Sequence, residues 1–298
     1  MSSDTSDTNE TKRADRADDG GSPDSASRPL PHERASRDAA RQYVLPLVVR
    51  IEKASPPART DALETAARAV LVMLSDERSL GEGEWAQAMR DWQDAQIRKV
   101  VRRARGAEWR RATALPGLTV TGPATATATA TSDSEPATDA EPAPALAPAP
   151  APAQTSVPPA EVRVFPPVPL DGWPKDLAKL QVSGTDLADP EPPPAPDPAH
   201  PVLWLNPELD MSAGKTMAQV GHGAQLAWWE LSETDRKAWR EAGFPLAVRT
   251  ADAHRWRELT AGGLPVVHDA GFTEIAPGET VAVEGGTGFC PLPRERRP

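Results

Sequence analysis

The sequence has little cysteine and no long apolar run, and each absence excludes a class of protein. Cys290 is the single cysteine among 298 residues. It excludes an intramolecular disulfide framework and a structural zinc site built on cysteines. No apolar run approaches the length of a membrane span, and the N-terminus lacks the apolar core of a signal peptide. We therefore expect a cytoplasmic protein, and we expect neither a metal nor a cofactor.

Much of the chain is poor in residues that could pack a core. It contains 34 prolines, and its mean hydropathy is -0.50. Stretches of this composition cannot bury enough apolar surface to fold alone. The expected organisation is a disordered tail (1–40), a first domain (41–186) with an Ala/Pro/Thr-rich insertion (122–160), a Pro-rich linker (187–200), a second domain (201–290) and a basic tail (291–298).

The negative charge is distributed unevenly along the chain. The formal net charge is -10, yet residues 41–120 sum to roughly +4 and residues 121–200 to roughly -8. The basic concentration begins at Arg98-Lys99 and continues through Arg102 and Arg103. This basic patch could contact phosphates, with Arg102 and Arg103 as the candidate substrate-binding residues. A solvated basic strand or helix face is the alternative.

From residue 201 onward, strands alternate with helices. The pattern predicts strands at 202–205, 244–248, 264–267 and 280–283. Ser212 is a candidate N-cap for a helix that runs to about residue 231, a second helix ends at Gly243, and Asp252 caps a third. This alternation predicts an α/β sandwich with a small, partly parallel sheet.

A polar face on the first of these helices is the most informative feature of the chain. Lys215, Gln219 and His222 are spaced at i, i+4 and i+7, so they lie on one helical face. A face that packed on the core would be apolar at this spacing, so this one is expected to line a site. Unpaired N–H groups and a partial positive charge at the helix N-terminus would favour an anionic or oxyanionic group there.

A second polar cluster follows the third predicted strand. Asp269 and Gly271 stand where open α/β sheets place ligand groups. In the alternative reading, Asp269 forms an Asx turn and bonds loop amides. The Pro277-Gly278 pair predicts a turn.

Together, the two clusters resemble the signature blocks of the type-two peptidyl-tRNA hydrolases. The first block reads Met211-Ser-Ala-Gly-Lys215 with Ala218, Gln219 and His222, and the second reads Asp269-Ala-Gly271 with Thr273 and Ile275-Ala-Pro277-Gly278. Their order, their separation and the strand–helix framework also match, over roughly residues 201–287.

The resemblance implies a fold, an activity and a set of site residues. That family is an α/β/α sandwich with a small mixed sheet, it cleaves the ester joining a peptide to the 3′ end of tRNA, and it usually forms homodimers. The implied catalytic group is Lys215, Asp269 and Thr273, with Thr280 as a further member. Gln219, His222 and Gly271 are expected to shape the substrate site, and tRNA is the expected partner.

The sequence also departs from the family pattern. Phe272 stands where the family usually has Arg, the turn before Thr280 is one residue short, and the usual final helix is missing. These departures support an alternative function, a catalytically impaired module that binds tRNA or a protein. A nucleotide-binding loop through Gly214-Lys215-Thr216 matches the known phosphate-binding motif in its last three letters alone.

The two halves of the chain can be aligned, which suggests an internal duplication. Val101 to Arg110 aligns with Val248 to Arg257. In the same comparison Val44 falls opposite Val202, and Arg59 falls opposite Lys215 after a loop two residues longer. Gly122 falls near Asp269. We therefore hypothesise a first copy that has lost its site and pairs with the second as a pseudo-dimer. An unrelated helical module is the alternative.

Overall fold

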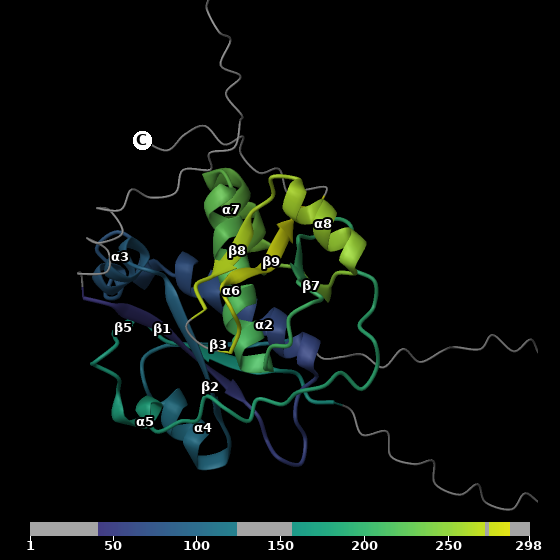
Figure 1. Cartoon of the computed structure of the whole chain (residues 1–298). Helices are drawn as coiled ribbons and strands as arrows, with labels where there is room; N and C mark the ends of the chain where they lie inside the picture. The colour runs from purple at the N-terminus through teal and green to yellow at the C-terminus, as the bar shows by residue number, and fades with distance from the viewer. Residues whose placement is uncertain (1–40, 124–156, 272–273, 287–298) are drawn as a thin grey trace, which may run out of the picture.

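The fold is described by a computed structural model over residues 41–123, 157–271 and 274–286 (Figure 1). The predictions for the tail 1–40, for most of the insertion 122–160 and for the basic tail 291–298 fall outside the described residues. Phe272, Thr273 and Cys290 fall outside them too. The described part forms two α/β units.

The first unit contains five strands, which form one sheet, together with its helices. In chain order the elements are β1 (Tyr43–Arg50), α2 (Arg59–Ser75), the short 3-10 helix η1 (Glu77–Ser79), α3 (Ala86–Asp94), β2 (Arg98–Ala104), α4 (Gly106–Thr113), β3 (Leu118–Thr121), β4 (Glu161–Val164), β5 (Val168–Pro169) and α5 (Lys175–Ala178). The described residues between 41 and 186 therefore form an α/β unit and not the unrelated helical module considered above.

The second unit follows the order predicted from the sequence. It contains β6 (Val202–Leu205), α6 (Ala213–Glu230), α7 (Glu233–Glu241), β7 (Ala247–Thr250), α8 (Ala253–Ala261), β8 (Val266–Asp269) and β9 (Gly278–Glu284). Ser212 caps α6 and Asp252 caps α8 through their side chains, as expected.

One strand of the second unit begins later than the sequence suggested. Residues 244–248 were expected to be a strand, but β7 begins at Ala247. Phe244 has a φ of 57°, outside the strand region, and its ring packs edge-on against Trp239. Aromatic packing at the end of α7 therefore takes Phe244 out of the strand.

The two sheets have the same topology. Strand order is β2-β1-β4-β3 in the first sheet, with β5 beside β1, and β7-β6-β9-β8 in the second. The first and second strands of each unit pair in parallel, and the remaining pairs on these paths are antiparallel. Each unit is thus a mixed α/β sandwich, as predicted. Descent from one duplicated ancestor remains a hypothesis that this likeness supports.

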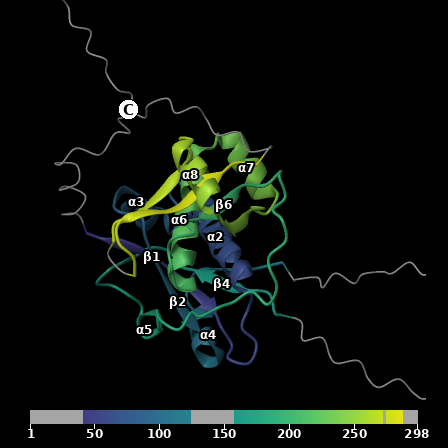
Figure 2. The same ribbon diagram turned by 45° about the vertical axis from the view of Figure 1, so that its right-hand side comes forward.

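Helices α2 and α6 lie side by side between the two sheets in both views (Figures 1 and 2). They share one apolar core with residues of both units. On the outer faces, α4 and α5 cover the first sheet around Trp109, and α8 covers the second around Trp256. Because the two units share a core, we treat them as one cooperative body.

Small residues on α6 allow its close packing. A Cβ atom on Gly221 would lie 3.0 Å from Val70 of α2, and one on Gly223 would lie 3.1 Å from Val281 of β9. Contacts this short leave no room for a side chain without displacement. The two glycines therefore set the depth at which α6 sits, and with it the position of its polar face.

The structure corrects the alignment of the two halves by two residues in the first strand and helix. Leu47 pairs with Val101 and Val164, as Leu203 pairs with Val248 and Val283. Val44 had been aligned with Val202, which the register excludes. The loop to the first helix is two residues longer in the first unit, as expected.

The Pro-rich stretch 187–200 contacts both units, although it was expected to be a spacer. Leu187 is buried in the shared core, and Asp189 accepts hydrogen bonds from the backbone and hydroxyl of Thr60 at 2.7 Å each. Arg249 donates to the Pro194 carbonyl. Within the described residues, no helix is long and apolar enough to cross a bilayer.

Candidate active site

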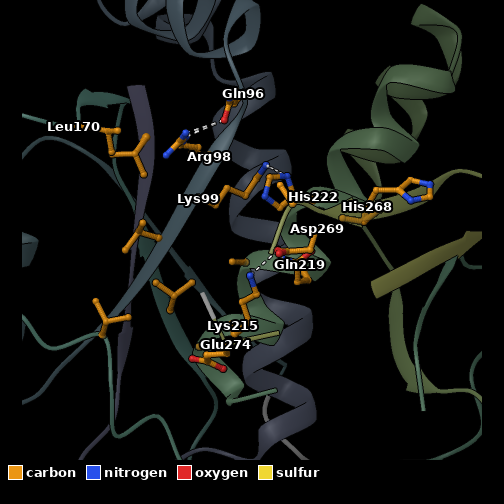
Figure 3. Close-up of a pocket in the computed structure, with 18 residues that line it drawn as sticks. Gln96, Arg98, Lys99, Leu170, Lys215, Gln219, His222, His268, Asp269 and Glu274 are labelled. Carbon is orange, nitrogen blue, oxygen red and sulfur yellow. Dashed lines mark hydrogen bonds and ion pairs between the residues drawn. The ribbon is translucent and has the colours of Figure 1, made fainter. Parts of the chain in front are cut away.

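A cleft of about 370 Å³ opens where the two units meet. Its walls come from β2 of the first unit and from α6, β8 and the following loop of the second. Lys215, Gln219 and His222 all line it, as does Asp269 (Figure 3). The polar face predicted from the sequence therefore does line a cavity, and the second unit supplies only part of its wall.

Lys215 and Asp269 form the central contact of the cleft. Lys215 Nζ donates to Asp269 Oδ2 at 2.5 Å, and the two side chains are 12% and 10% exposed. Lys215 stands in the first turn of α6, where the Ser212 hydroxyl accepts its backbone N–H. The helix cap thus fixes the lysine backbone while the carboxylate holds its ammonium group.

Asp269 accepts hydrogen bonds on both carboxylate oxygens. Gln219 Nε2 donates to Oδ2 at 2.6 Å and the Gly271 N–H donates to Oδ1 at 2.7 Å. Burial raises the pKa of Asp269, but the bonds from Lys215, Gly271 and Gln219 and the Lys215 charge outweigh it, so the net pKa lies below its usual value. Asp269 is therefore a carboxylate at neutral pH. The Asx-turn hydrogen bond from Gly271 is present, but it is one of three hydrogen bonds that Asp269 accepts.

The backbone at Gly271 requires glycine. Its φ is +78°, and a Cβ atom there would lie 2.5 Å from Pro277. A side chain would meet both a left-handed conformation and a clash. Gly271 thus allows the tight loop that brings its own N–H to Asp269, although it does not line the cleft.

Thr280 lies one layer behind the cleft. It is fully buried, and its hydroxyl can donate to Gln219 Oε1 at 2.8 Å or to the Val267 carbonyl at 3.3 Å. The residue sits where the β8–β9 register shifts. Thr280 does not line the cleft, so its link to Asp269 runs through Gln219.

His222 faces a residue of the first unit. Lys99, on β2, places its Nζ 3.2 Å from His222 Nδ1 (Figure 3). Burial, followed by the charges of Lys99 and Lys215, lowers the pKa of His222 well below its usual value. His222 is therefore neutral at physiological pH.

The cleft also contains residues that were not among the expected site residues. Arg98 and Lys99 line it, as does Glu274, whose carboxylate accepts from the backbone and hydroxyl of Ser212 at 3.0 and 2.8 Å. The strand alternation contained the signal for Lys99, because Lys99 shares a face with buried Val101.

Arg102 and Arg103 do not line the cleft, although both were candidate substrate contacts. Arg102 donates to the carbonyls of Ala178 and Leu180 and stacks on Trp173. Arg103 bonds to Ser183 and Gln181. Both side chains hold the segment that follows α5 against the first sheet.

The first unit has a closed network where the second has the cleft. Asp61, Thr65 and Arg68 on α2 have the same i, i+4, i+7 spacing as Lys215, Gln219 and His222 on α6. Gly122 takes the position of Asp269, because Val120 pairs with Val162 as Val267 pairs with Val281.

The register of the helices follows from these contacts. Asp61 faces Gly122, where a Cβ atom would overlap its carboxylate, as Lys215 faces Asp269. Asp61, not Arg59, is therefore the counterpart of Lys215, and the sequence alignment at Arg59 was wrong by two residues. Arg59 instead reaches Thr216 across the helix interface at 3.4 Å.

The arrangement in the cleft suits electrostatic and proton-transfer chemistry. It offers an ammonium group in the first turn of a helix, an ionised carboxylate beside it and a neutral imidazole. Among the described residues, no group of three His, Cys, Asp or Glu side chains could hold a metal ion.

Comparison with known proteins gives one family match, and it covers the second unit. No solved structure matches the chain. The resemblance that the two sequence blocks indicated is confirmed for the second unit: residues 200–291 match the family model described as peptidyl-tRNA hydrolase PTH2.

Proposed function

We propose that the chain hydrolyses the ester bond of peptidyl-tRNA, releasing tRNA and peptide. The observation that carries the proposal is the Lys215–Asp269 pair, set in a cleft within the segment that matches the family model. Both residues come from the blocks that resemble the family, and they lie in contact despite their separation in sequence.

Lys215 is the candidate electrophilic group. When water attacks an ester carbonyl, negative charge develops on the carbonyl oxygen, and a fixed positive charge stabilises it. The ammonium group of Lys215 combines its own charge with the partial positive charge of the α6 N-terminus. Asp269 holds that ammonium in one orientation before substrate arrives.

Asp269 is the candidate residue for orienting water. Its Oδ2 accepts from Lys215 and Gln219, while Oδ1 accepts from Gly271 alone among the contacts described. A carboxylate offers about four acceptor positions, so Oδ1 retains capacity for a water proton. The lowered pKa makes Asp269 a weak base, which favours orienting water over removing its proton fully.

The two threonines have different proposed roles. Thr280 positions Gln219, which in turn donates to Asp269, so we propose that it supports the site without touching substrate. Thr273 lies outside the described residues. Its role in positioning water or the terminal ribose rests on the resemblance alone.

An impaired binding module is the weaker proposal. A unit that had lost catalysis would be expected to lack the Lys–Asp contact or the residue that supports it. In the second unit the contact and its support are both present. The departure at Phe272 concerns one sequence position, where the resemblance implies an Arg that would contact phosphate. We propose that the basic residues of β2 that line the cleft hold the RNA instead.

The test is release of labelled peptide from peptidyl-tRNA by the wild-type chain and by Lys215→Met. We expect release by wild type and a loss of roughly 10²–10³-fold in kcat for the variant, as for removal of an oxyanion donor. A gel-shift assay with uncharged tRNA checks that the variant still binds. Wild-type protein that binds tRNA but releases no peptide would contradict the proposal and favour the binding module.

A further inference from the structure

Lys99 is a basic residue of the first unit that is buried in the wall of the second unit's site. Its relative exposure is 8%, and it lines the cleft together with Lys215 and His222. The counterpart of Lys99 in the second unit is Leu246, because Val101 and Val248 hold the same register. The lysine is therefore specific to the first unit, whose strand β2 borders the cleft.

The contacts of Lys99 are all with neutral groups. Its Nζ donates to Gln225 Oε1 at 2.6 Å and to the Ile97 carbonyl at 3.4 Å, and it lies 3.2 Å from His222 Nδ1. The Trp92 ring centroid is 4.8 Å away. Within the part of the chain that the structure describes, no carboxylate pairs with it. A buried ammonium is costly without a counter-charge.

The acidic groups of the cleft are already engaged elsewhere. Asp269 accepts from Lys215, Gln219 and Gly271, and Glu274 accepts from Ser212. The other titratable side chains that line the cleft, Arg98, Lys215, His222 and His268, are basic. Burial alone lowers the pKa of Lys99 well below its usual value, and an anion bound beside Nζ would raise it again and stabilise the ammonium form. The cleft thus has an excess of basic groups at the Lys99 end.

We propose that Lys99 binds a phosphate of the substrate RNA beside the ester-hydrolysing pair. The inference rests on the proposed function, which decides the kind of anion. The peptide's terminal carboxyl is esterified in the substrate, so the nearest anion to the scissile bond is the phosphodiester that precedes the terminal ribose. That phosphate supplies the counter-charge that Lys99 lacks.

This assignment gives the first unit a role at the active site. β2 carries both Lys99 and Arg98 to the cleft, while α6 carries Lys215. The unit that has lost its own site thereby completes the site of the other, as a partner subunit would in a dimer. Phosphate contacts position a nucleic acid without reading its sequence, so Lys99 should act on binding more than on chemistry.

The experiment compares Lys99→Met with wild type for binding of uncharged tRNA across a salt series and for hydrolysis of peptidyl-tRNA. Methionine keeps the length of the side chain and removes the charge. Lys53→Met is the matched control, because Lys53 is an exposed lysine of the same unit that does not line the cleft. Lys99→Arg restores a charge at the same position.

For Lys99→Met we expect tRNA binding to weaken roughly 10- to 100-fold, as for loss of a charge-assisted hydrogen bond. The slope of log K against log salt should fall by about 0.7–0.9, the value for one phosphate. KM should rise more than kcat falls. Lys53→Met should leave the affinity unchanged, and Lys99→Arg should restore the slope.

A stability measurement separates phosphate binding from a structural role. Because Lys99 lacks a counter-charge in the free protein, Lys99→Met should unfold in urea at the same or a higher midpoint than wild type. A lower midpoint, or tRNA binding equal to wild type, would overturn the proposal. Active wild type with an unaffected Lys99→Met would remove this inference and leave the hydrolase. Lys99-dependent tRNA binding without peptide release would remove the hydrolase proposal and keep the phosphate site. A wild-type chain that neither binds tRNA nor releases peptide would overturn both proposals.

Discussion

The two units share one topology but differ in the side chains at equivalent positions. The positions compared are Asp61, Thr65, Arg68 and Gly122 in the first unit and Lys215, Gln219, His222 and Asp269 in the second. In the first unit a carboxylate on the helix fills the space that a side chain at Gly122 would need, and it accepts the Ala160 N–H at 2.6 Å. In the second unit the helix carries the cation and the strand carries the carboxylate.

The difference shows that one framework can hold a cleft-facing lysine–carboxylate pair in one unit and a closed network in the other. A lysine–carboxylate pair facing a cleft can act on a ligand, whereas Asp61 is satisfied by groups of its own unit. What the first unit retains is the strand that borders the other site. Matched substitutions in the two units test this difference.

The largest effect is expected from one chemical change made at two places. Asp269→Asn removes the charge that holds Lys215, and we expect peptidyl-tRNA hydrolysis to fall roughly 10²–10⁴-fold. Asp61→Asn makes the same change in the first unit, away from the cleft, and should leave the rate within about twofold, because Asp61 does not line the site. Equal losses in the two variants would break the comparison. Initial rates on labelled peptidyl-tRNA are the measurement.

The next effect concerns the contact between units. Glu64 of α2 accepts from Arg249 at 2.9 Å and from the Val248 N–H at 3.1 Å, with side chains 15% and 13% exposed for Glu64 and Arg249. Glu64→Gln should lower the free energy of unfolding by about 3 kcal/mol, because it leaves Arg249 without its anion. Urea unfolding should show one transition in both proteins, since the units share a core. Two separate transitions would argue against one cooperative body.

A smaller effect is expected from rebuilding the missing side chain of the first unit. Gly122→Ala would place a methyl group against the Asp61 carboxylate, and we expect a loss of about 1–3 kcal/mol of stability from overpacking. Asp61→Gly made together with it should recover part of the loss, which a double-mutant cycle measures. Additive losses would mean that the two residues do not meet.

The smallest effect is a pH dependence at the third position of the helical face. The pKa of His222 is lowered by burial and by Lys99 and Lys215, so the unfolded state takes up its proton first as pH falls. Stability should therefore decrease as pH drops below about 6.5, by at most about 1.4 kcal/mol per pH unit. His222→Asn should reduce this slope, and Arg68→Gln in the first unit should not. Urea unfolding between pH 5 and 7.5 tests it.

The sequence predicted the second unit well because local signals agreed there. The caps at Ser212 and Asp252, the spacing of Lys215, Gln219 and His222, and the position of Asp269 all followed from short-range pattern. The sequence also predicted that Gly122 falls near the position of Asp269, because the strands of the two halves could be aligned there. Phe244 was misassigned because packing on Trp239 overrode its strand preference.

Other features required the tertiary structure. The pairing of Arg59 with Lys215 was wrong because a helix register cannot be read from one basic residue when a loop changes length. Arg102 and Arg103 were chosen from a charge run, but the strand turns them toward carbonyls of the segment after α5. The role of Lys99 depends on a neighbour 123 positions away, which no local pattern specifies.

The central claim is that the two similar units carry one working site, built across their boundary. Binding stoichiometry for a peptidyl-tRNA analogue with a non-cleavable 3′-amide link tests this most directly, measured by titration calorimetry on the full chain. One analogue should bind per chain, and Lys99→Met in the first unit should reduce its affinity. Two analogues per chain, or one whose binding ignores Lys99, would contradict the claim.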